Sequence, residues 1–282
     1  AKMNSNLLSM KRWVRGIFYI VLITVALIQI YPFFWVVTSS LKTNADLARA
    51  AYLLPSEIFI GHYKEALQSD LLKYFFNSMV VAVSVLFFLV IISAPAGYAL
   101  SKMKFRYNEK VMTFFLLGMM IPAFACLIPM FQFYNMLKLR NTYWALIIPQ
   151  VGFGLPVCIY LYKNFMSRIP DSLTEAAEID GAEHGYILGK IIFPMSKNIT
   201  VTILTFNFVN IWNEFTYANT FMSSGKMKTL PVGLNDFVGE MGGVNWGATF
   251  ATITLSMLPT LIIYAVLNKQ VIEGMTAGAI KS

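Results

Sequence analysis

Charged side chains are scarce in this chain of 282 residues: Asp, Glu, Lys and Arg make up 13% of it, whereas hydrophobic residues make up 57%. A soluble domain typically carries about 25% charged residues, so this composition excludes an ordinary soluble protein. The two cysteines, Cys126 and Cys158, fall in apolar runs, which favours packing groups over a disulfide or a metal site. The two histidines, His62 and His184, fall in segments that we place on opposite sides of a membrane. We therefore predict no metal site and no catalytic site on this chain.

Two longer patterns are absent as well. No G-x-x-x-x-G-K-[ST] phosphate loop occurs, so any ATP chemistry would take place on another polypeptide. We find no internal repeat, whereas many secondary transporters consist of two related halves. One hypothesis for such a chain is an ion-coupled secondary transporter, which would also require coupling carboxylates or pairs of broken helices in both halves.

Long apolar runs make up most of the sequence. A helix needs about 20 mostly apolar residues to cross a bilayer, because the hydrocarbon core is about 30 Å thick and a helix rises about 1.5 Å per residue. Prolines inside the runs, such as Pro95, Pro122 and Pro129, predict kinks. We predict an all-α, polytopic membrane bundle with six transmembrane helices, at about residues 17–37, 74–100, 111–137, 141–162, 198–222 and 247–267.

The distribution of basic residues predicts the orientation of this bundle. With a cytoplasmic N-terminus, 14 of the 22 Lys and Arg residues would lie inside and 8 outside, which favours a cytoplasmic N-terminus and C-terminus. The net charge of +8 follows mainly from this bias, so it does not indicate nucleic-acid binding. We thus expect a cytoplasmic N-terminus at 1–16, a six-helix transmembrane domain at 17–267 and a cytoplasmic tail at 268–282. Of the external segments, 41–73 is expected to form a small ordered lid, and 223–245 is rich in glycine.

The cytoplasmic loop between the fourth and fifth runs, at 170–195, is unusually acidic, with five acids and no Lys or Arg at 171–183. Ser172 followed by Glu175 fits a capping box, which predicts the start of a helix, and Gly181 predicts its end. A second short helix with an apolar stripe follows. This hinged pair is either a docking surface for a basic partner or an interfacial amphipathic helix, although its acids argue against binding anionic lipid.

The fifth apolar run contains the sharpest polar signal within a span, FNFVNIWNEFTY at 206–217. At about 100° per residue, five polar side chains fall on one helix face. A carboxylate deep in a bilayer costs about 2.5–3.5 kcal/mol, so Glu214 must face partners, water or a ligand. Amides and aromatic rings suit a ligand rich in hydroxyl groups, which favours a path for a sugar; the alternative is hydrogen bonding between neighbouring helices. The five candidates for lining this path are Asn207, Asn210, Asn213, Glu214 and Tyr217.

Several motifs together resemble a known family, the membrane subunits of binding-protein-dependent ABC importers. The acidic loop carries the EAA signature of that family, with Phe193 where Leu is common. Its signature residues are Glu175, Ala176, Ala177, Gly181, Ile191 and Pro194. The resemblance extends over nearly the whole chain and is to the carbohydrate-uptake class, specifically the smaller permease subunit of the maltose-importer type. The further motifs are SSLK at 39–42, NS beginning at Asn77, AGYALSK at 96–102, WNEF at 212–215, TLPVGL at 229–234 and GMTAGAIKS at 274–282.

The resemblance implies a non-catalytic permease subunit of an ATP-driven sugar or oligosaccharide importer in the bacterial cytoplasmic membrane. The implied partners are a second homologous permease, two ATPase subunits that hold ATP and Mg, and an extracellular or periplasmic sugar-binding protein, with no cofactor on this chain and no nucleic acid. In that family the acidic loop is the coupling helix, the C-terminal tail reaches between the ATPases, and a loop equivalent to 223–245 probes the binding protein. The implied ATPase-coupling residues are Glu175, Ala176, Ala177, Glu178, Asp180, Gly181, Ile191 and Pro194, and the tail residues are Gly274, Thr276, Gly278 and Lys281.

Overall fold

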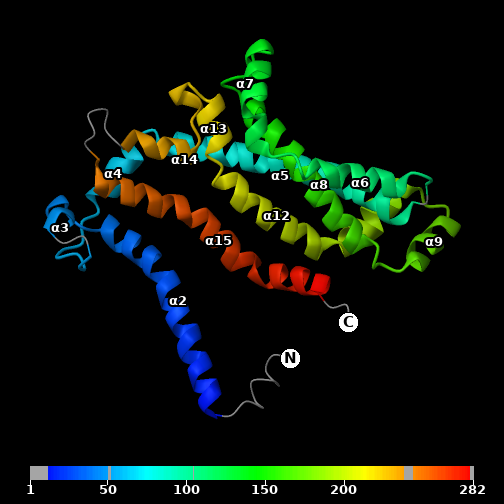
Figure 1. Cartoon of the computed structure of the whole chain (residues 1–282), viewed down its shortest axis with the longest axis horizontal. Coiled ribbons are helices and arrows are strands. Elements are labelled where there is room, and N and C mark those ends of the chain that lie inside the picture. The colour runs from blue at the N-terminus through cyan, green and yellow to red at the C-terminus, as the bar shows by residue number, and fades with distance from the viewer. Residues whose placement is uncertain (1–11, 50–51, 104, 238–243, 280–282) are drawn as a thin grey trace. The chain divides into compact units, whose positions relative to one another are not determined.

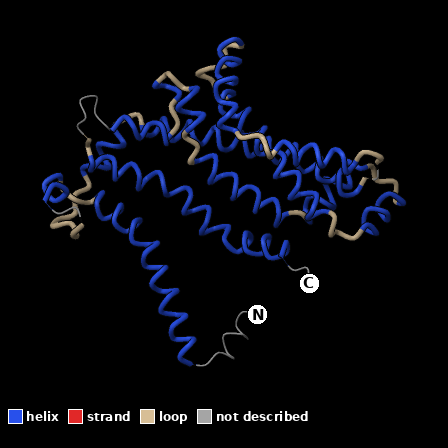
Figure 2. The backbone as a smooth tube through the Cα atoms, in the orientation of Figure 1, coloured by secondary structure: helices blue, strands red, loops and turns tan. Residues whose placement is uncertain are grey.

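The computed structural model describes residues 12–49, 52–103, 105–237 and 244–279, and its main helices are labelled in Figure 1. Figure 2 shows helices joined by loops, with no strand in this described part, and the predicted all-α class is confirmed. The chain divides into two compact units, which we describe separately. The first comprises Ala1–Ser69 with Phe237–Leu255, and the second comprises Asp70–Asp236 with Ser256–Ser282.

The helices differ widely in length. The long ones are α2 (Arg12–Ser40), α5 (Leu71–Lys102), α8 (Trp144–Met166), α12 (Lys197–Trp212) and α15 (Trp246–Ala279). Those of intermediate length are α4 (Gly61–Gln68), α6 (Asn108–Gly118), α7 (Leu127–Met136) and α9 (Asp171–Ile179). The short α-helices are α3 (Asn44–Arg49), α10 (His184–Ile187), α11 (Phe193–Met195), α13 (Thr216–Phe221) and α14 (Leu230–Gly233). There are also 3₁₀-helices η1 (Ala123–Cys126), η3 (Gly225–Met227) and η4 (Leu234–Phe237), and a π-helix η2 (Leu188–Ile192).

Four helices among the described residues are long and apolar enough to cross a membrane, or up to six if each bent pair counts as one span. The single helices are Trp13–Ser40, Leu71–Lys102, Trp144–Met166 and Trp246–Asn268. The two bent pairs are Asn108–Gly118 with Ala123–Met136, at an angle of 78°, and His184–Met195 with Lys197–Trp212, at 74°. The apolar runs therefore become helices, and their sidedness stays a prediction.

The prolines have unequal effects on these helices. α5 continues through Pro95 and α8 continues through Pro149 and Pro156, although a proline removes one backbone hydrogen bond. The helix is interrupted only before Pro122 in the third apolar run, where Pro122 has an extended backbone and precedes η1. The bend expected at Pro122 is present, since the helices on either side of it meet at 78°, whereas the kinks expected at Pro95 and Pro129 stay a prediction.

The expected fifth helix at 198–222 is not continuous. α12 ends at Trp212, residues 213–215 leave the helix, and α13 restarts at Thr216. On its N-terminal side, α12 is paired with the bent segment His184–Met195, whose apolar residues extend the run before residue 198. The predicted span at 198–222 thus contains two helices, α12 and α13, where one was predicted.

The core of the second unit lies between α5, α8 and α12, which contact one another. α5 buries a stripe that includes Val81, Val85 and Leu89. Near its C-terminal end, a Cβ atom built on Gly97 would lie 2.5 Å from Cβ of Tyr162, so only glycine permits this close approach to α8. A third helix joins at this end, where Leu100, Met112 and Ile159 form a buried cluster.

In the first unit, α2 exposes nearly all of its apolar side chains, as a lipid-facing helix would. Contacts are concentrated at its C-terminal end. The ring of Trp35 packs edge to face on the ring of Phe250, with 5.1 Å between the ring centroids. The hydroxyls of Ser40 and Tyr63 are 2.6 Å apart. The end of α2 is therefore anchored on α4 and the first turns of α15.

Candidate functional site

The acidic loop forms a compact helical element, which we call the acidic element and define as residues 171–195. It comprises α9, a turn at 180–183, α10, the π-helix η2 and α11. The turn is a Schellman motif: Ala182 N–H donates to Ala177 O at 2.9 Å, and Gly181 N–H donates to Glu178 O at 3.0 Å. Gly181 has φ +82°, a left-handed conformation that favours glycine. The expected helix, hinge and helix are present at these residues.

The start of α9 differs from the capping box that we expected. Pro170 adopts an extended backbone immediately before the helix, and α9 begins at Asp171 without a side-chain cap. Ser172 therefore lies inside the first turn, where its hydroxyl cannot act as the N-cap. Asp171 in the first turn instead places a negative charge where the helix dipole favours it.

A cleft of about 600 Å³ opens at the turn of the acidic element. Its lining includes Ala177, Asp180, Gly181 and Ile191 of the predicted coupling set. Glu175, Ala176, Glu178 and Pro194 are exposed on the same element. The two most exposed of its large apolar side chains are Ile179, at 86%, and Tyr186, which lines the cleft, at 60%. Large apolar side chains that are exposed among polar residues are typical of an interaction surface.

Two residues at the C-terminal end of α5 hold the acidic element, and our sequence reasoning gave neither a role. The Lys102 side chain is only 2% exposed, and its Nζ donates to Asp171 Oδ1 at 2.6 Å and to Ile169 O. One turn earlier, the Tyr98 hydroxyl lies 3.3 Å from Nδ1 of His184. Lys102 and Tyr98 both fall in the AGYALSK motif, but no spacing in the sequence indicates partners so distant along the chain.

The predicted polar stripe does not lie on one face of one helix. Asn207 Nδ2 donates to Ile203 O at 2.9 Å, and Asn213 Nδ2 donates to Val209 O at 2.8 Å. Asn210 and Asn213 are exposed, whereas Tyr217 is buried and its ring stacks on Phe221. The helical-wheel argument assumed an unbroken helix, and the interruption at 213–215 separates Tyr217 from the asparagines.

Glu214 is satisfied by the backbone. Its Oε1 accepts the Tyr217 N–H at 2.6 Å and its Oε2 accepts the Ala218 N–H at 3.2 Å, so the carboxylate caps the N-terminus of α13. The group that a bilayer makes costly is thereby hydrogen-bonded within its own segment.

The predicted tail falls partly outside the described residues. Gly274, Thr276 and Gly278 lie in the last turns of α15, which extends to Ala279, whereas Lys281 lies outside the described residues. The helix thus runs well beyond the predicted span at 247–267.

At the opposite end of α5 from Lys102, three residues hold the segment 224–236. Asn77 Nδ2 donates to Lys226 O at 3.1 Å and to Lys228 O at 2.8 Å. The Ser78 hydroxyl accepts the Leu230 N–H at 2.8 Å, and the Tyr74 hydroxyl donates to Asp236 at 2.5 Å. The side-chain oxygen of Asn77, Oδ1, also accepts from the Tyr143 hydroxyl at 2.7 Å. The NS motif therefore serves as an anchor for this segment.

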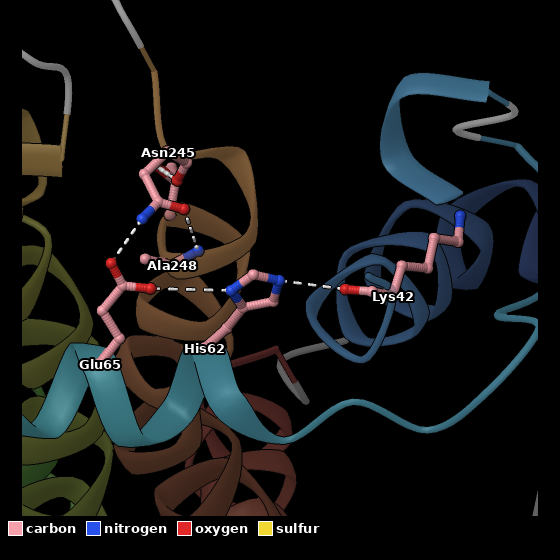
Figure 3. A network of polar contacts seen from close by, with 6 residues as sticks. Lys42, His62, Glu65, Asn245 and Ala248 are labelled. Carbon is pink, nitrogen blue, oxygen red and sulfur yellow. Dashed lines mark hydrogen bonds and ion pairs between the residues drawn. The ribbon is translucent and has the colours of Figure 1, made fainter. Parts of the chain in front are cut away.

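The expected lid at 41–73 is held by a polar network in the first unit (Figure 3). His62 is buried, with Nε2 3.1 Å from Lys42 O and Nδ1 3.8 Å from Glu65. Asn245 joins Glu65 to α15, since its Nδ2 donates to Glu65 at 2.7 Å and its Oδ1 accepts the Ala248 N–H at 3.1 Å.

A second contact orders the lid between α3 and α4. Ser56 donates to the Asp46 carboxylate from its hydroxyl at 2.7 Å and from its backbone N–H at 3.2 Å. These hydrogen bonds, with the Ser56 hydroxyl first, hold the pKa of Asp46 below its usual value.

The chain is similar to known transport proteins in both sequence and structure. The family model described as "Binding-protein-dependent transport system inner membrane component" matches residues 90–277, a range that contains the acidic element and the polar stripe. The chain is 36% identical to the putative ABC transporter permease protein ORF2 of Caldicellulosiruptor sp. (strain Rt8B.4), over 96% of this chain and 97% of that protein.

Two further relatives have names that include a sugar. One is the galactooligosaccharides transport system permease protein GanQ of Bacillus subtilis, at 30% identity over 97% of this chain and 98% of GanQ. The other is the trehalose/maltose transport system permease protein MalG of Thermococcus litoralis, at 31% identity over 92% of this chain and 94% of MalG. Among solved structures, a bacterial ABC transporter involved in the import of the acidic polysaccharide alginate matches with a TM-score of 0.81 and 25% identity, over 92% of this chain and 98% of that chain.

Proposed function

Since the chain belongs to the family of binding-protein-dependent transport system inner membrane components, we propose that it is the permease subunit of an ATP-driven importer of a sugar or oligosaccharide. The names of its relatives support the carbohydrate class, because GanQ, MalG and the alginate importer are all named for the saccharides they transport. The bacterial cytoplasmic membrane is the compartment that fits an inner membrane component with several apolar helices.

The acidic element is the proposed contact with a separate ATPase subunit. The observation that carries this proposal is the combination of a cleft, exposed carboxylates on the same element and the exposed side chains of Ile179 and Tyr186. Burying these apolar groups in a partner would contribute favourable free energy, and the carboxylates would select a basic surface. The proposed coupling residues remain Glu175, Ala176, Ala177, Glu178, Asp180, Gly181, Ile191 and Pro194. The ATPase would bind ATP and Mg, and this chain would hold no cofactor and carry out no catalysis.

The proposed complex contains a second homologous permease, two ATPase subunits and an external sugar-binding protein. In the path between the two permeases, the exposed amides of Asn210 and Asn213 would contact the sugar. Asn207, Glu214 and Tyr217 would shape the wall through the contacts described above. At the cytoplasmic end, we propose that Gly274, Thr276, Gly278 and Lys281 reach the ATPases.

Reconstitution tests this function. The permease pair, the ATPase and the binding protein from the same operon are placed in liposomes, and uptake of labelled maltose, raffinose and galactooligosaccharides is measured with and without ATP. We expect uptake of at least one saccharide that depends on ATP. Uptake driven by an ion gradient in the absence of ATP would instead identify a secondary transporter.

A matched pair of variants tests the docking surface. Tyr186→Ser removes an exposed aromatic side chain that lines the cleft, and we expect it to reduce co-purification of the ATPase. Met195→Ser removes another exposed apolar group of the same element, one that does not line the cleft, and should leave co-purification intact. Equal retention of the ATPase by both variants would contradict the docking assignment.

A further inference from the structure

α5 is the helix that holds both the acidic element and the segment 224–236, at opposite ends. Tyr98 and Lys102 are one turn apart and therefore lie on one face of α5, where they contact His184 and Asp171. Asn77 and Ser78 hold the backbone of 226–230 at the other end. At about 1.5 Å per residue, Ser78 and Tyr98 are about 30 Å apart along the helix, which is about the thickness of the hydrocarbon core.

At both ends of α5, buried side chains hold the neighbouring segment through hydrogen bonds. The side chain of Lys102 is only 2% exposed, and its ammonium group contacts a carboxylate and a backbone carbonyl, so removal of either partner leaves a buried charge less well compensated. Asn77 is 3% exposed and Ser78 is 4% exposed, and both bond to backbone atoms, which cannot move without moving the segment itself. Motion at one end of α5 must therefore displace the segment held there or break buried hydrogen bonds.

The helix between the two ends is supported along its length. Its buried stripe packs against α8, and at Gly97 and Tyr162 the two helices approach each other so closely that no side chain fits at residue 97. α5 also remains one continuous helix through Pro95. Since packed helices shift as rigid bodies, a displacement at either end is transmitted to the other.

We propose that α5 is a mechanical link between the acidic element and the segment 224–236, with Tyr98 and Lys102 as positioning residues at one end and Asn77 and Ser78 at the other. Nucleotide binding on the ATPase would move the acidic element, and α5 would carry that movement to the external face. This inference rests on the proposed function, because it requires that an ATPase act on the acidic element.

Each end of α5 is tested by a measurement at the other end. The assembled importer in nanodiscs is analysed by hydrogen–deuterium exchange with and without a non-hydrolysable ATP analogue and Mg. For Lys102→Met, exchange is followed at 224–230; for Ser78→Ala and Asn77→Asp, it is followed at 172–180. A purely local role would leave the distant segment unchanged, so this readout separates the link from simple loss of an anchor.

We expect the nucleotide-dependent difference in exchange at the distant segment to fall by about fivefold in these variants, a typical coupling between sites. Asp171→Asn is a second inner variant with less risk to folding, because its carboxylate is 67% exposed. In the double variant Lys102→Met/Ser78→Ala, the loss should not exceed that of the stronger single variant, since both act through one helix.

Two matched controls remove neighbouring hydrogen bonds and leave the link intact. Tyr143→Phe removes a bond to Asn77 without touching the bonds from Asn77 to 226–230. Ser101→Ala removes a local bond to Tyr98 O on the same turn as Lys102. Both should respond to nucleotide as the unaltered complex does.

The outcomes distinguish the link from the function. A full nucleotide-dependent difference in Lys102→Met and Ser78→Ala, an equal loss in the two controls, or no difference at 224–230 in the unaltered complex would overturn the link alone. Failure of any ATPase to assemble with the unaltered permease would overturn the proposed function and the link with it.

Discussion

The carboxylate of Glu214 accepts the backbone N–H of Tyr217 at 2.6 Å, so the acid in the predicted fifth span is the cap of a short helix. A second bond, from Ala218 N–H at 3.2 Å, uses the other carboxylate oxygen. The cap accounts for two features together. It satisfies the charged group inside an apolar segment, and it stabilises the start of α13 after the chain leaves α12.

The cap predicts how two substitutions at Glu214 differ. Glu214→Leu leaves two backbone N–H groups without their partner and should lower the free energy of unfolding by about 0.5–2 kcal/mol. Glu214→Gln keeps one acceptor oxygen and should lose less. Thermal unfolding of the purified chain in detergent measures both. Equal losses in the two variants would show that the charge matters and that the acceptor alone does not suffice.

Uptake measurements separate the cap from contact with the sugar. Asn210 is exposed, and its side chain makes no hydrogen bond within the described part of the chain. Asn210→Ala should therefore leave thermal stability unchanged. If its amide binds the sugar, the variant should raise the KM for uptake in the reconstituted importer, because a hydrogen bond to the substrate is lost. Asn219→Ala, another exposed asparagine on α13, is the control. An unchanged KM in Asn210→Ala would remove this residue from the path.

The left-handed conformation of Gly181 predicts a dependence on backbone preference. Nothing lies within 4 Å of a Cβ atom built there, so a side chain is disfavoured by φ +82° and not by lack of space. Gly181→Val should cost about 1–2 kcal/mol in the turn and impair ATP-driven uptake, whereas Gly181→Asn should be milder because asparagine adopts this conformation more readily. Gly181→Asp should leave the protein in the membrane but uncouple uptake, through its side chain at the docking face.

Gly185→Ala is the matched control for this turn. A Cβ atom added at Gly185 would also meet open space, but the φ of Gly185 is not left-handed. Assays of ATP hydrolysis and uptake in the same liposomes show whether coupling has changed. Normal coupling in both Gly181→Val and Gly181→Asp would contradict a role for the turn in docking.

Two glycines of the second unit predict effects of opposite sign. A Cβ atom on Gly97 would lie 2.5 Å from Tyr162 Cβ and 3.0 Å from the backbone nitrogen of Lys163, so Gly97→Ala should destabilise by about 3 kcal/mol as α5 moves away from α8. Gly152 lies within α8, and a Cβ atom built there would have nothing within 4 Å. Gly152→Ala should therefore stabilise the protein by about 0.5–1 kcal/mol. Midpoints of thermal unfolding decide both, and a stable Gly97→Ala protein would refute the close packing.

The sequence predicted the helices whose signal is local. Continuous apolar runs identified α2, α5, α8 and the first part of α15, because length and composition alone decide whether a helix is apolar enough to cross a membrane. The hinge of the acidic element was also predictable, since Gly181 has the backbone freedom that a Schellman turn requires.

The features that the sequence did not reveal depend on contacts or on competition between neighbours. The polar stripe was drawn on an ideal helix, yet the side chain of Glu214 competes for the backbone and interrupts that helix. The roles of Lys102 and Asn77 depend on partners 69 and about 150 residues away, and no local pattern encodes such pairs. The start of α9 was misplaced because Pro170 sets the boundary two residues before the expected cap, Ser172.

The lid offers a last prediction, in which a second substitution should compensate for the first. A Cβ atom on Gly247 would lie 2.1 Å from Nε2 of His62, so Gly247→Ala should displace the buried ring, break its contact with Lys42 O and cost about 1–3 kcal/mol. His62→Ala alone also removes that contact but leaves a cavity, and in Gly247→Ala/His62→Ala the added methyl group would occupy part of it. The double variant should therefore be more stable than the sum of the single effects predicts. Thermal unfolding of the three variants measures this, and strictly additive losses would show that the ring of His62 does not lie against Gly247.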